Sequence, residues 1–278
     1  MSVFLQLQQW LPKHGLSRLL GRLAASESPL LSRTLIDTFS RVYGVRLDDA
    51  ARRSPRDYRS FNDFFTRELA TNARQFDGLG NVLTSPADGT LSQFGPIERG
   101  QLIQAKGTPY ACGELLGDDG LAALLDGGWF ATVYLAPRDY HRVHLPFAGT
   151  LRRSREIPGE LFSVNATTEA GIQGLFCRNE RLVCEFDTVA GPMVVVLVGA
   201  LIVASIETVW DGPISPYRER RERQHDIPFA RGAEIGRFLL GSTVIVLLPP
   251  DTVSVNSLTQ GQSIQVGSVL GDIKRSPH

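Results

Sequence analysis

Residues 238–248 read Phe-Leu-Leu-Gly-Ser-Thr-Val-Ile-Val-Leu-Leu, an apolar run interrupted by Gly241, Ser242 and Thr243. Continuous apolar residues rich in Val and Ile predict a strand that is buried on both faces. Hydroxyl groups cost stability in such a strand unless they are hydrogen-bonded. Because Gly241 has no side chain, the carbonyl before Ser242 stays accessible. The stretch therefore predicts a buried strand whose serine can attack its own upstream peptide bond, although Gly-Ser-Thr alone occurs in many loops.

Similar short β-branched runs, separated by Gly and Pro, fill the chain after about residue 76. They lie at 90–95, 129–135, 148–155, 182–189, 194–198, 201–208 and 243–248. Helical patterns come earlier, at 29–41 and 61–69. The predicted fold class is α+β: a basic helical N-terminal region, residues 1–76, precedes a mainly antiparallel β core, residues 77–278, that carries the site.

The composition is that of one large domain, or of a core with a helical appendage. The chain has 278 residues, of which 42% are hydrophobic. Its formal net charge is zero, so no nucleic-acid partner is expected. The three cysteines lack zinc-type spacing and are expected to be reduced thiols. The charged segment 217–223 is expected to be a solvated loop or a helix end.

Neither a secretory signal nor a transmembrane helix is expected. Lys13 follows the first apolar positions instead of preceding them. The longest apolar run, residues 193–206, is shorter than the roughly 20 residues that span a bilayer. Its Val and Ile content predicts two buried strands that meet near Gly199.

The N-terminus carries an amphipathic pattern. Leucines at helical spacing share one face: Leu16, Leu19, Leu20 and Leu23. Arg18 and Arg22 lie on another face, and Trp10 and Lys13 precede them. This composition is typical of a helix in a membrane interface, but an apolar stripe is also typical of a helix packed on its own domain. The sequence alone leaves both interpretations open.

Two further segments hold groups that can activate a serine. Residues 84–90, Thr-Ser-Pro-Ala-Asp-Gly-Thr, predict a turn that presents Asp88. Residues 134–146 contain His141 and His144, two of the five histidines. A nucleophile, a base and an orienting carboxylate are recognised by their roles rather than their order, here Ser242, His144 and Asp88. Taken singly, each also fits a structural role, as a turn aspartate or a surface histidine at a strand end.

Together these segments closely resemble the phosphatidylserine decarboxylase family. The resemblance rests on Pro-Ala-Asp-Gly at 86–89, Pro-Arg-Asp-Tyr-His-Arg-Val-His at 137–144 and Leu-Gly-Ser-Thr at 240–243. It extends to Pro-Gly-Glu-Leu-Phe-Ser-Val-Asn at 158–165 and Leu-Phe-Cys-Arg-Asn-Glu-Arg at 175–181. The motifs follow the family's order over nearly the whole chain, and no matched catalytic position departs from it.

The resemblance implies an enzyme that cuts itself and then decarboxylates phosphatidylserine to phosphatidylethanolamine. In this family His144 would act as base and Asp88 would hold its imidazole, so that Ser242 attacks the carbonyl of Gly241. Elimination and hydrolysis would then yield a β chain of residues 1–241 and an α chain of residues 242–278. The α chain would begin with a pyruvoyl group made from Ser242, whose ketone condenses with the headgroup amine.

The chemistry of decarboxylation agrees with a pyruvoyl group. The carbanion left by CO2 needs an electron sink that side chains do not supply. Pyridoxal phosphate would need a Schiff-base lysine, and none of the chain's three lysines lies in a cofactor setting. His141 is the expected proton donor, because histidine titrates near neutral pH. No metal is expected, since His141-x-x-His144 lacks a third ligand.

The expected partners are phosphatidylserine, an anionic membrane surface, and the protein's own α and β chains as a heterodimer or a higher oligomer. The expected location is the cytoplasmic side of the cell membrane, with peripheral attachment. Three alternatives stay open. A pyruvoyl decarboxylase of a soluble amino acid would not need the amphipathic N-terminus. A serine hydrolase would use the same Asp88, His144 and Ser242, but the chain has no Gly-x-Ser-x-Gly elbow. A non-catalytic membrane-binding β domain would stay uncut.

Overall fold

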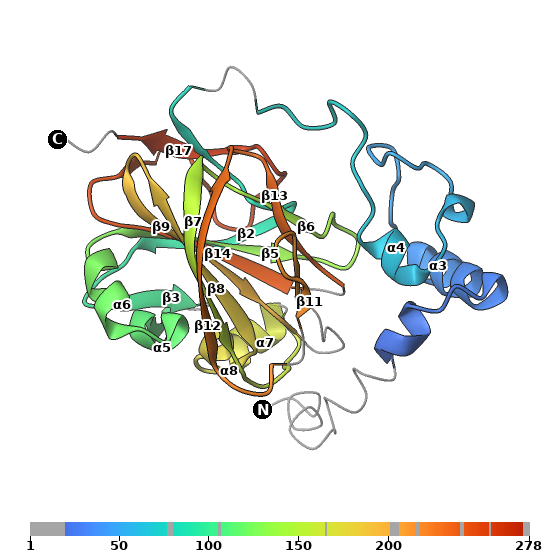
Figure 1. Cartoon of the computed structure of the whole chain (residues 1–278), viewed down its shortest axis with the longest axis horizontal. Helices are drawn as coiled ribbons and strands as arrows, with labels where there is room; N and C mark the ends of the chain where they lie inside the picture. Colours follow the sequence, from blue (N-terminus) through green and yellow to red (C-terminus); the bar gives the residue numbers. More distant parts are fainter. Residues whose placement is uncertain are drawn as a thin grey trace.

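The computed structural model describes residues 20–76, 80–104, 107–164, 166–200, 206–214, 217–239, 242–255 and 257–274. In these residues antiparallel sheets predominate over short helices, which confirms the predicted α+β class. The helices nearest the N-terminus, blue in Figure 1, lie beside the β-rich part of the molecule. None of the helices in the described ranges is long and apolar enough to cross a membrane.

The N-terminal helices are α3 (Pro29–Tyr43), the 3₁₀ turn η1 (Pro55–Asp57) and α4 (Phe61–Phe65). Ser60 caps α4 by accepting a hydrogen bond from the backbone of Asp63. The helix predicted over 61–69 ends at Phe65, because the backbone of residues 68–70 bonds to residues 49–51 instead. Aromatic side chains of α3 and α4 form a small core of their own, which contains Phe61, Phe64 and Phe65.

The main sheet has eight strands in the spatial order β12-β7-β8-β9-β14-β5-β2-β16. Their bounds are β2 (Gly89–Pro96), β5 (Trp129–Leu135), β7 (Gly149–Ile157), β8 (Arg181–Thr188), β9 (Gly191–Val198), β12 (Arg221–Phe229), β14 (Ser242–Leu248) and β16 (Ser263–Ile264). Every pairing is antiparallel, and β14 lies between β5 and β9 with all seven residues buried. The predicted buried strand at 243–248 is therefore confirmed.

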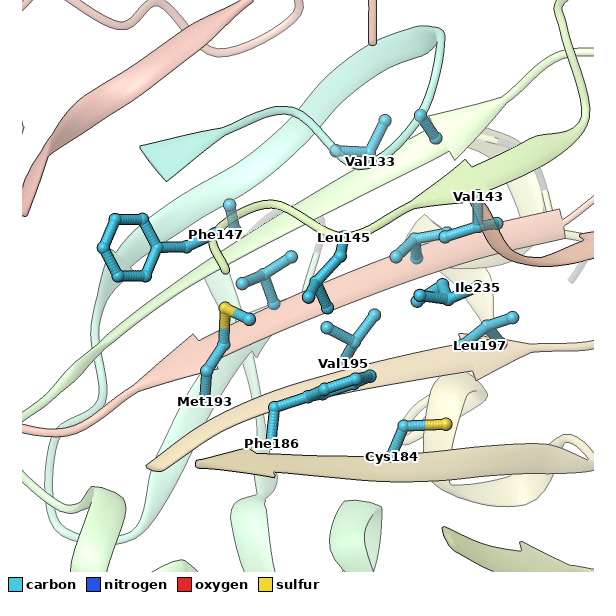
Figure 2. Packing of buried hydrophobic residues seen from close by; sticks show 14 of the residues in the cluster. Val133, Val143, Leu145, Phe147, Cys184, Phe186, Met193, Val195, Leu197 and Ile235 are labelled. Carbon is cyan, nitrogen blue, oxygen red and sulfur yellow. The ribbon is translucent and has the colours of Figure 1, made fainter. Parts of the chain in front are cut away.

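Smaller sheets pack on one face of this sheet. One contains β11 (Gly212–Ile214), β10 (Ile206–Thr208), β13 (Glu234–Phe238) and β6 (Arg142–His144). Another contains β1 (Val82–Thr84), β17 (Val269–Ile273) and β15 (Val253–Ser254). The core between the layers includes Val133, Val195 and Leu197 of the main sheet and Val143 and Ile235 of the small one (Figure 2). Successive side chains of a strand point to opposite faces of the sheet, so every second residue of these strands contributes to this core.

The opposite face of the main sheet forms a second core beneath short helices. These are α5 (Cys112–Leu116), α6 (Asp119–Leu125) and α8 (Leu175–Arg178), while α7 (Ala166–Gly171) precedes α8. A two-stranded sheet of β3 (Gln101–Gln104) and β4 (Thr108–Ala111) leads into α5. Both faces of β14 are thus covered, which explains its lack of polar alternation.

The charged segment at 217–223 matches its prediction only in part: residues 217–220 form a loop, whereas residues 221–223 belong to a strand. Arg221 begins the edge strand β12, which pairs with β7. Glu222 stands opposite Arg155 in the register, and their side chains form an ion pair at 2.9 Å. Complementary charges on the neighbouring strand stabilise this pairing, while charged residues suit an edge strand.

Candidate active site

Ser242 is the first residue of β14 and pairs with Leu135, the last residue of β5. Its side chain is buried, and Thr243 beside it is completely buried. Neither hydroxyl has a hydrogen-bond partner in the described structure. Two unsatisfied hydroxyls in a central strand reduce stability, so packing alone does not explain these residues. Gly241, the expected cleavage-site carbonyl, lies outside the described residues.

The two hydroxyls lie on different faces of the main sheet. Val244 and Val246 belong to the core beneath the small sheets, whereas Ile245 and Leu247 belong to the core beneath the helices. Because side chains alternate along a strand, Ser242 lies on the side of the small sheets. The small sheet there contains β13 and β6. His144 is the last residue of β6, and His141 directly precedes this strand.

Backbone pairing brings His141 close to Ser242 in the fold. The N–H of Phe238, at the end of β13, donates to the carbonyl of His141 at 2.9 Å. Four residues further along the chain Ser242 pairs with Leu135. A four-residue step spans at most about 14 Å. The loop from β5 to β6 therefore begins beside Ser242, after Leu135, and is bonded to Phe238 through the carbonyl of His141.

His141 is fully buried at this loop. Its Nδ1 lies 2.8 Å from the carbonyl oxygen of Asp139, which can only accept, so Nδ1 carries the proton. Nε2 is left with no partner in the described residues. Burial, with a smaller contribution from the nearby Arg67 cation, lowers the pKa of His141 to about 3, although the hydrogen bond to Asp139 opposes this shift. The near-neutral pKa expected from the sequence is wrong for this environment, in which the ring is neutral.

The N-terminal region supplies part of the wall around His141. The ring of Phe65 in α4 lies 4.0 Å from the imidazole. Arg67, which is almost fully buried, donates from Nη2 to the carbonyls of Arg138 and Asp139 at 2.9 and 3.0 Å. No sequence pattern marked Arg67, because its partners are backbone groups some 70 positions away.

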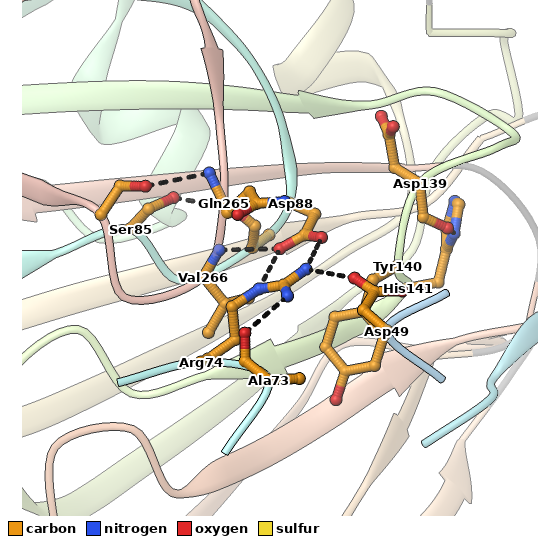
Figure 3. A network of polar contacts seen from close by, with 12 residues as sticks. Asp49, Ala73, Arg74, Ser85, Asp88, Asp139, Tyr140, His141, Gln265 and Val266 are labelled. Carbon is orange, nitrogen blue, oxygen red and sulfur yellow. Dashed lines mark hydrogen bonds and ion pairs between the residues drawn. The ribbon is translucent and has the colours of Figure 1, made fainter. Parts of the chain in front are cut away.

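Asp88 lies in the turn between β1 and β2, and this turn requires a glycine next to it. A Cβ on Gly89 would lie 2.1 Å from the carbonyl oxygen of Tyr134. The Asp88 carboxylate accepts from Arg74 at 2.5 Å and from the backbone N–H of Val266 at 2.7 Å (Figure 3). Arg74 also bonds Asp49 at 2.9 Å. The carboxylate is thus fixed by a buried cation that the sequence analysis missed.

His144 has partners other than Asp88. Its Nδ1 lies 2.7 Å from the carbonyl oxygen of Gly232, and its Nε2 lies 2.9 Å from the hydroxyl of Tyr140. The hydrogen bond from the imidazole of His144 to the carboxylate of Asp88, which the resemblance implies, is therefore absent from the described structure. Neither residue bonds the hydroxyl of Ser242.

Strand alternation explains where His144 points. Val143 faces the core, so Arg142 and His144 occupy the other face of β6. There they line a surface depression of about 290 Å³ together with Tyr140, Arg74 and other residues of the 68–76 segment. Burial lowers the pKa of His144, so the ring is neutral and able to accept a proton at neutral pH.

The described residues contain no group of three or more His, Cys, Asp or Glu side chains placed to hold a metal ion. A carbonyl group formed at position 242 would fit there, because the buried hydroxyl of Ser242 has no hydrogen-bond partner that the change would remove. Fold and site together describe a β-rich protein with a buried, unpartnered serine at the start of a central strand.

Comparison with known families agrees with this description. The phosphatidylserine decarboxylase family model matches residues 61–272, and a second model, described as PSD, matches residues 3–44. The chain belongs to the phosphatidylserine decarboxylase family.

Several similar proteins are named phosphatidylserine decarboxylase proenzyme. One from Psychrobacter cryohalolentis is 51% identical over 276 residues, covering 99% of this chain and 100% of the relative. One from Acinetobacter baumannii is 47% identical and covers 95% of this chain and 94% of the relative. One from Vibrio parahaemolyticus is 48% identical and covers 94% and 95%. The similarity therefore extends over both the helical region and the β core.

Proposed function

We propose that this protein decarboxylates phosphatidylserine to phosphatidylethanolamine, using a pyruvoyl group that it makes from its own Ser242. The observation that carries the proposal is the buried, unpartnered hydroxyl of Ser242 at the start of β14. Its support is family membership and the names of the relatives, which include the word proenzyme. A proenzyme must be processed before it acts, and a buried internal serine is suited to that step.

Self-cleavage begins when the oxygen of Ser242 attacks the carbonyl carbon of Gly241. A C–O bond forms, the C–N bond between the two residues breaks, and the departing nitrogen takes up a proton. His144 is the proposed base, and its neutral ring can accept the hydroxyl proton. Asp88, which bonds Arg74 and not His144, is proposed to assist the base through its negative charge near the imidazole. The side chains of Ser242 and His144 must approach each other for this step, since no hydrogen bond joins them.

The ester then eliminates: a proton leaves Cα of residue 242 as its Cβ–O bond breaks, which frees the Gly241 carboxylate and leaves a dehydroalanine at position 242. Water hydrolyses this residue to the pyruvoyl ketone and ammonia leaves. The products, residues 1–241 and 242–278, are proposed to stay together as a heterodimer or a higher oligomer. The pyruvoyl group at position 242 supplies the electron sink for CO2 loss. His141 is the proposed proton donor to the decarboxylated headgroup. Because burial keeps His141 neutral, its free Nε2 has to accept a proton before it can return one.

The test of the proposed function compares two substrates. The purified protein is incubated with vesicles that contain phosphatidylserine and, separately, with free serine. We expect CO2 and phosphatidylethanolamine from the vesicles and no CO2 from free serine. Equal turnover of both would favour a decarboxylase of soluble amino acids. Turnover of neither by a fully cut preparation would contradict both functions.

His141→Ala should separate the two reactions. We expect normal self-cleavage, because His144 is the proposed base, but a loss of decarboxylation of about 10²–10⁴-fold, which is typical when an acid–base group is removed. Denaturing gels measure cutting, and CO2 release measures turnover. If His141→Ala stayed uncut while His144→Ala was cut, the two histidines would have to exchange roles.

We propose that the two regions of the chain have different functions. Residues 1–76 attach the enzyme peripherally to the cytoplasmic face of the cell membrane, and residues 77–278 carry the active site. Much of the amphipathic pattern, including Trp10, Lys13, Leu16, Leu19 and Arg18, lies outside the described residues. Residues 20–24 are helical, and Arg22 and Leu23 are exposed there. Leu30 and Val42 of α3 are also exposed large hydrophobic residues. These residues are available to a lipid surface.

Changing both Arg18 and Arg22 to Gln should weaken binding to anionic vesicles. Each basic residue contributes about 1 kcal/mol near a charged membrane, so the double variant should bind roughly tenfold or more weakly at low salt. High salt should reduce the difference, because exposed charges are screened beyond about 10 Å at 0.1 M. Vesicle sedimentation at two salt concentrations measures both effects. Equal binding of both proteins under all conditions would show that these arginines do not anchor the enzyme.

A further inference from the structure

The candidate base His144 is held at both ring nitrogens by groups outside the expected Ser-His-Asp set. A carbonyl oxygen has no proton to donate, so the contact with Gly232 places the proton of the neutral ring on Nδ1. Nε2 is then the nitrogen with a free electron pair. The hydroxyl of Tyr140 lies 2.9 Å from it and must be the donor in that hydrogen bond.

Tyr140 is buried and contacts the imidazole of His144 through both its ring and its hydroxyl. It is 4% exposed, and burial raises its pKa, so it stays a neutral hydroxyl at any pH at which the protein functions. Its ring stacks on the imidazole with 5.7 Å between the ring centroids and 29° between the planes. Phe76 also stacks on His144, at 6.2 Å. The aromatic contacts therefore restrict the ring, while the hydroxyl contacts its basic nitrogen.

Asp88 does not hydrogen-bond the imidazole of His144 in the described structure, because its carboxylate has other partners. Its carboxylate bonds Arg74 and the backbone of Val266. Charged groups around the imidazole come from several elements: Glu234 of β13, Arg142 of β6, Asp88 of the β1–β2 turn, and Arg74 and Glu68 of the segment after α4. Among the groups in the described residues, Tyr140 and Gly232 are those that hydrogen-bond the ring.

We propose that Tyr140 is a positioning residue for self-cleavage: its hydroxyl orients His144 and keeps Nε2 unprotonated until the hydroxyl of Ser242 replaces it at that nitrogen. The proposal rests on the proposed role of His144 as the base. A hydrogen bond donated to Nε2 exists only while that nitrogen is unprotonated, so it favours the neutral ring. Gly232 fixes the tautomer from the other side.

The test is Tyr140→Phe, which keeps the stacked ring and removes only the hydroxyl. Precursor is made by cell-free synthesis, and self-cleavage is timed on denaturing gels from pH 5 to 8. Without the hydroxyl the protonated form of His144 is less disfavoured, so its pKa rises and cleavage needs a higher pH. We expect the midpoint of the pH profile to move up by about 0.5 to 1 unit, the effect of one hydrogen bond. Below the midpoint, cleavage should be about 3- to 10-fold slower.

The matched control is Tyr43→Phe in α3, an exposed tyrosine that should leave the profile unchanged. A profile for Tyr140→Phe with the wild-type midpoint, whether or not it is uniformly slower, would overturn the proposal. If the wild-type chain itself is never cut, the proposed function fails; if wild type is cut and only the shift is missing, this inference alone fails.

A second measurement does not depend on the Tyr140 variant. Histidine ¹⁵N NMR of the full-length Ser242→Ala chain reports the tautomer of His144 without any enzyme activity. We expect the proton on Nδ1 and a hydrogen-bonded, unprotonated Nε2 at neutral pH. A proton on Nε2, or a doubly protonated ring at pH 7, would contradict the arrangement.

Discussion

Ser242→Ala should give a single uncut chain of 30.5 kDa with no decarboxylase activity. The change removes the attacking oxygen and also the atom that would become the ketone, so both reactions are lost together. Few substitutions combine so complete a functional loss with so little structural change. Denaturing gels and a CO2-release assay on phosphatidylserine vesicles measure the two losses.

The same variant should not be less stable than an unprocessed wild-type chain. The hydroxyl of Ser242 is buried without a partner, so replacing it with a methyl group removes an unsatisfied polar group. We expect a gain of about 1 kcal/mol in the free energy of unfolding, measured in denaturant at equal chain integrity. Ser263→Ala in β16, an exposed serine, is the matched control and should be cut normally. Recovery of normal fragments from Ser242→Ala would exclude Ser242 as the cleavage nucleophile.

His144→Ala should also accumulate uncut precursor, because a serine hydroxyl of high pKa needs a base to take its proton. We expect cleavage to slow by about 10²–10⁴-fold, measured as the fraction of cut chain over time. Asp88→Asn should slow cleavage as well, since Asp88 lies in the same electrostatic environment as His144.

The two variants should differ in stability. Asp88→Asn removes the charge that balances Arg74, although Asp49 remains bonded to that arginine. Removing one partner of a buried ion pair can cost up to about 3–5 kcal/mol, so the Asn variant should unfold at a lower temperature than wild type. Asp187→Asn, at an exposed ion pair, should change neither cutting nor stability appreciably. Wild-type rates of cutting in both His144→Ala and Asp88→Asn would contradict the assigned roles.

Much of the β core follows from local patterns. The run at 243–248 has no polar alternation because helices cover one face of β14 and small sheets cover the other. In the run at 193–206, β9 ends at Val198, next to Gly199 as predicted, and Ile206 begins β10; the residues expected to form most of the second strand, 201–205, lie outside the described ranges. Such strands can be predicted because short length, flanking Gly or Pro and β-branched residues favour a buried strand over a buried helix.

Two elements depend on partners that the local sequence does not reveal. The segment that begins at Arg221 is a strand because Arg155 on β7 supplies the opposite charge for Glu222. The helix at α4 stops at Phe65 because the backbone beyond it pairs with residues 49–51. Composition predicted a charged loop or helix end for the first segment and a longer helix for the second. In both, pairing with residues distant in the sequence determines the observed structure.

The candidate site shows the same division. The motifs predict Asp88, His144 and Ser242 as candidate reactive groups, but they do not predict the atoms that hold these side chains. Arg74 and Gly232 contact these residues from 14 and 88 positions away, through geometry that no spacing rule encodes. The pKa of His141 depends on burial under Phe65 and on Arg67, so its ordinary solution value was a poor guide.

The most direct test of the central claim is the intact mass of freshly purified wild-type protein under denaturing conditions. We expect two polypeptides, residues 1–241 and residues 242–278, and the smaller one should resist N-terminal sequencing because a pyruvoyl group has no amine. A single species at 30.5 kDa with a free serine at position 242, in a preparation that releases CO2 from phosphatidylserine, would contradict self-cleavage as the source of the activity.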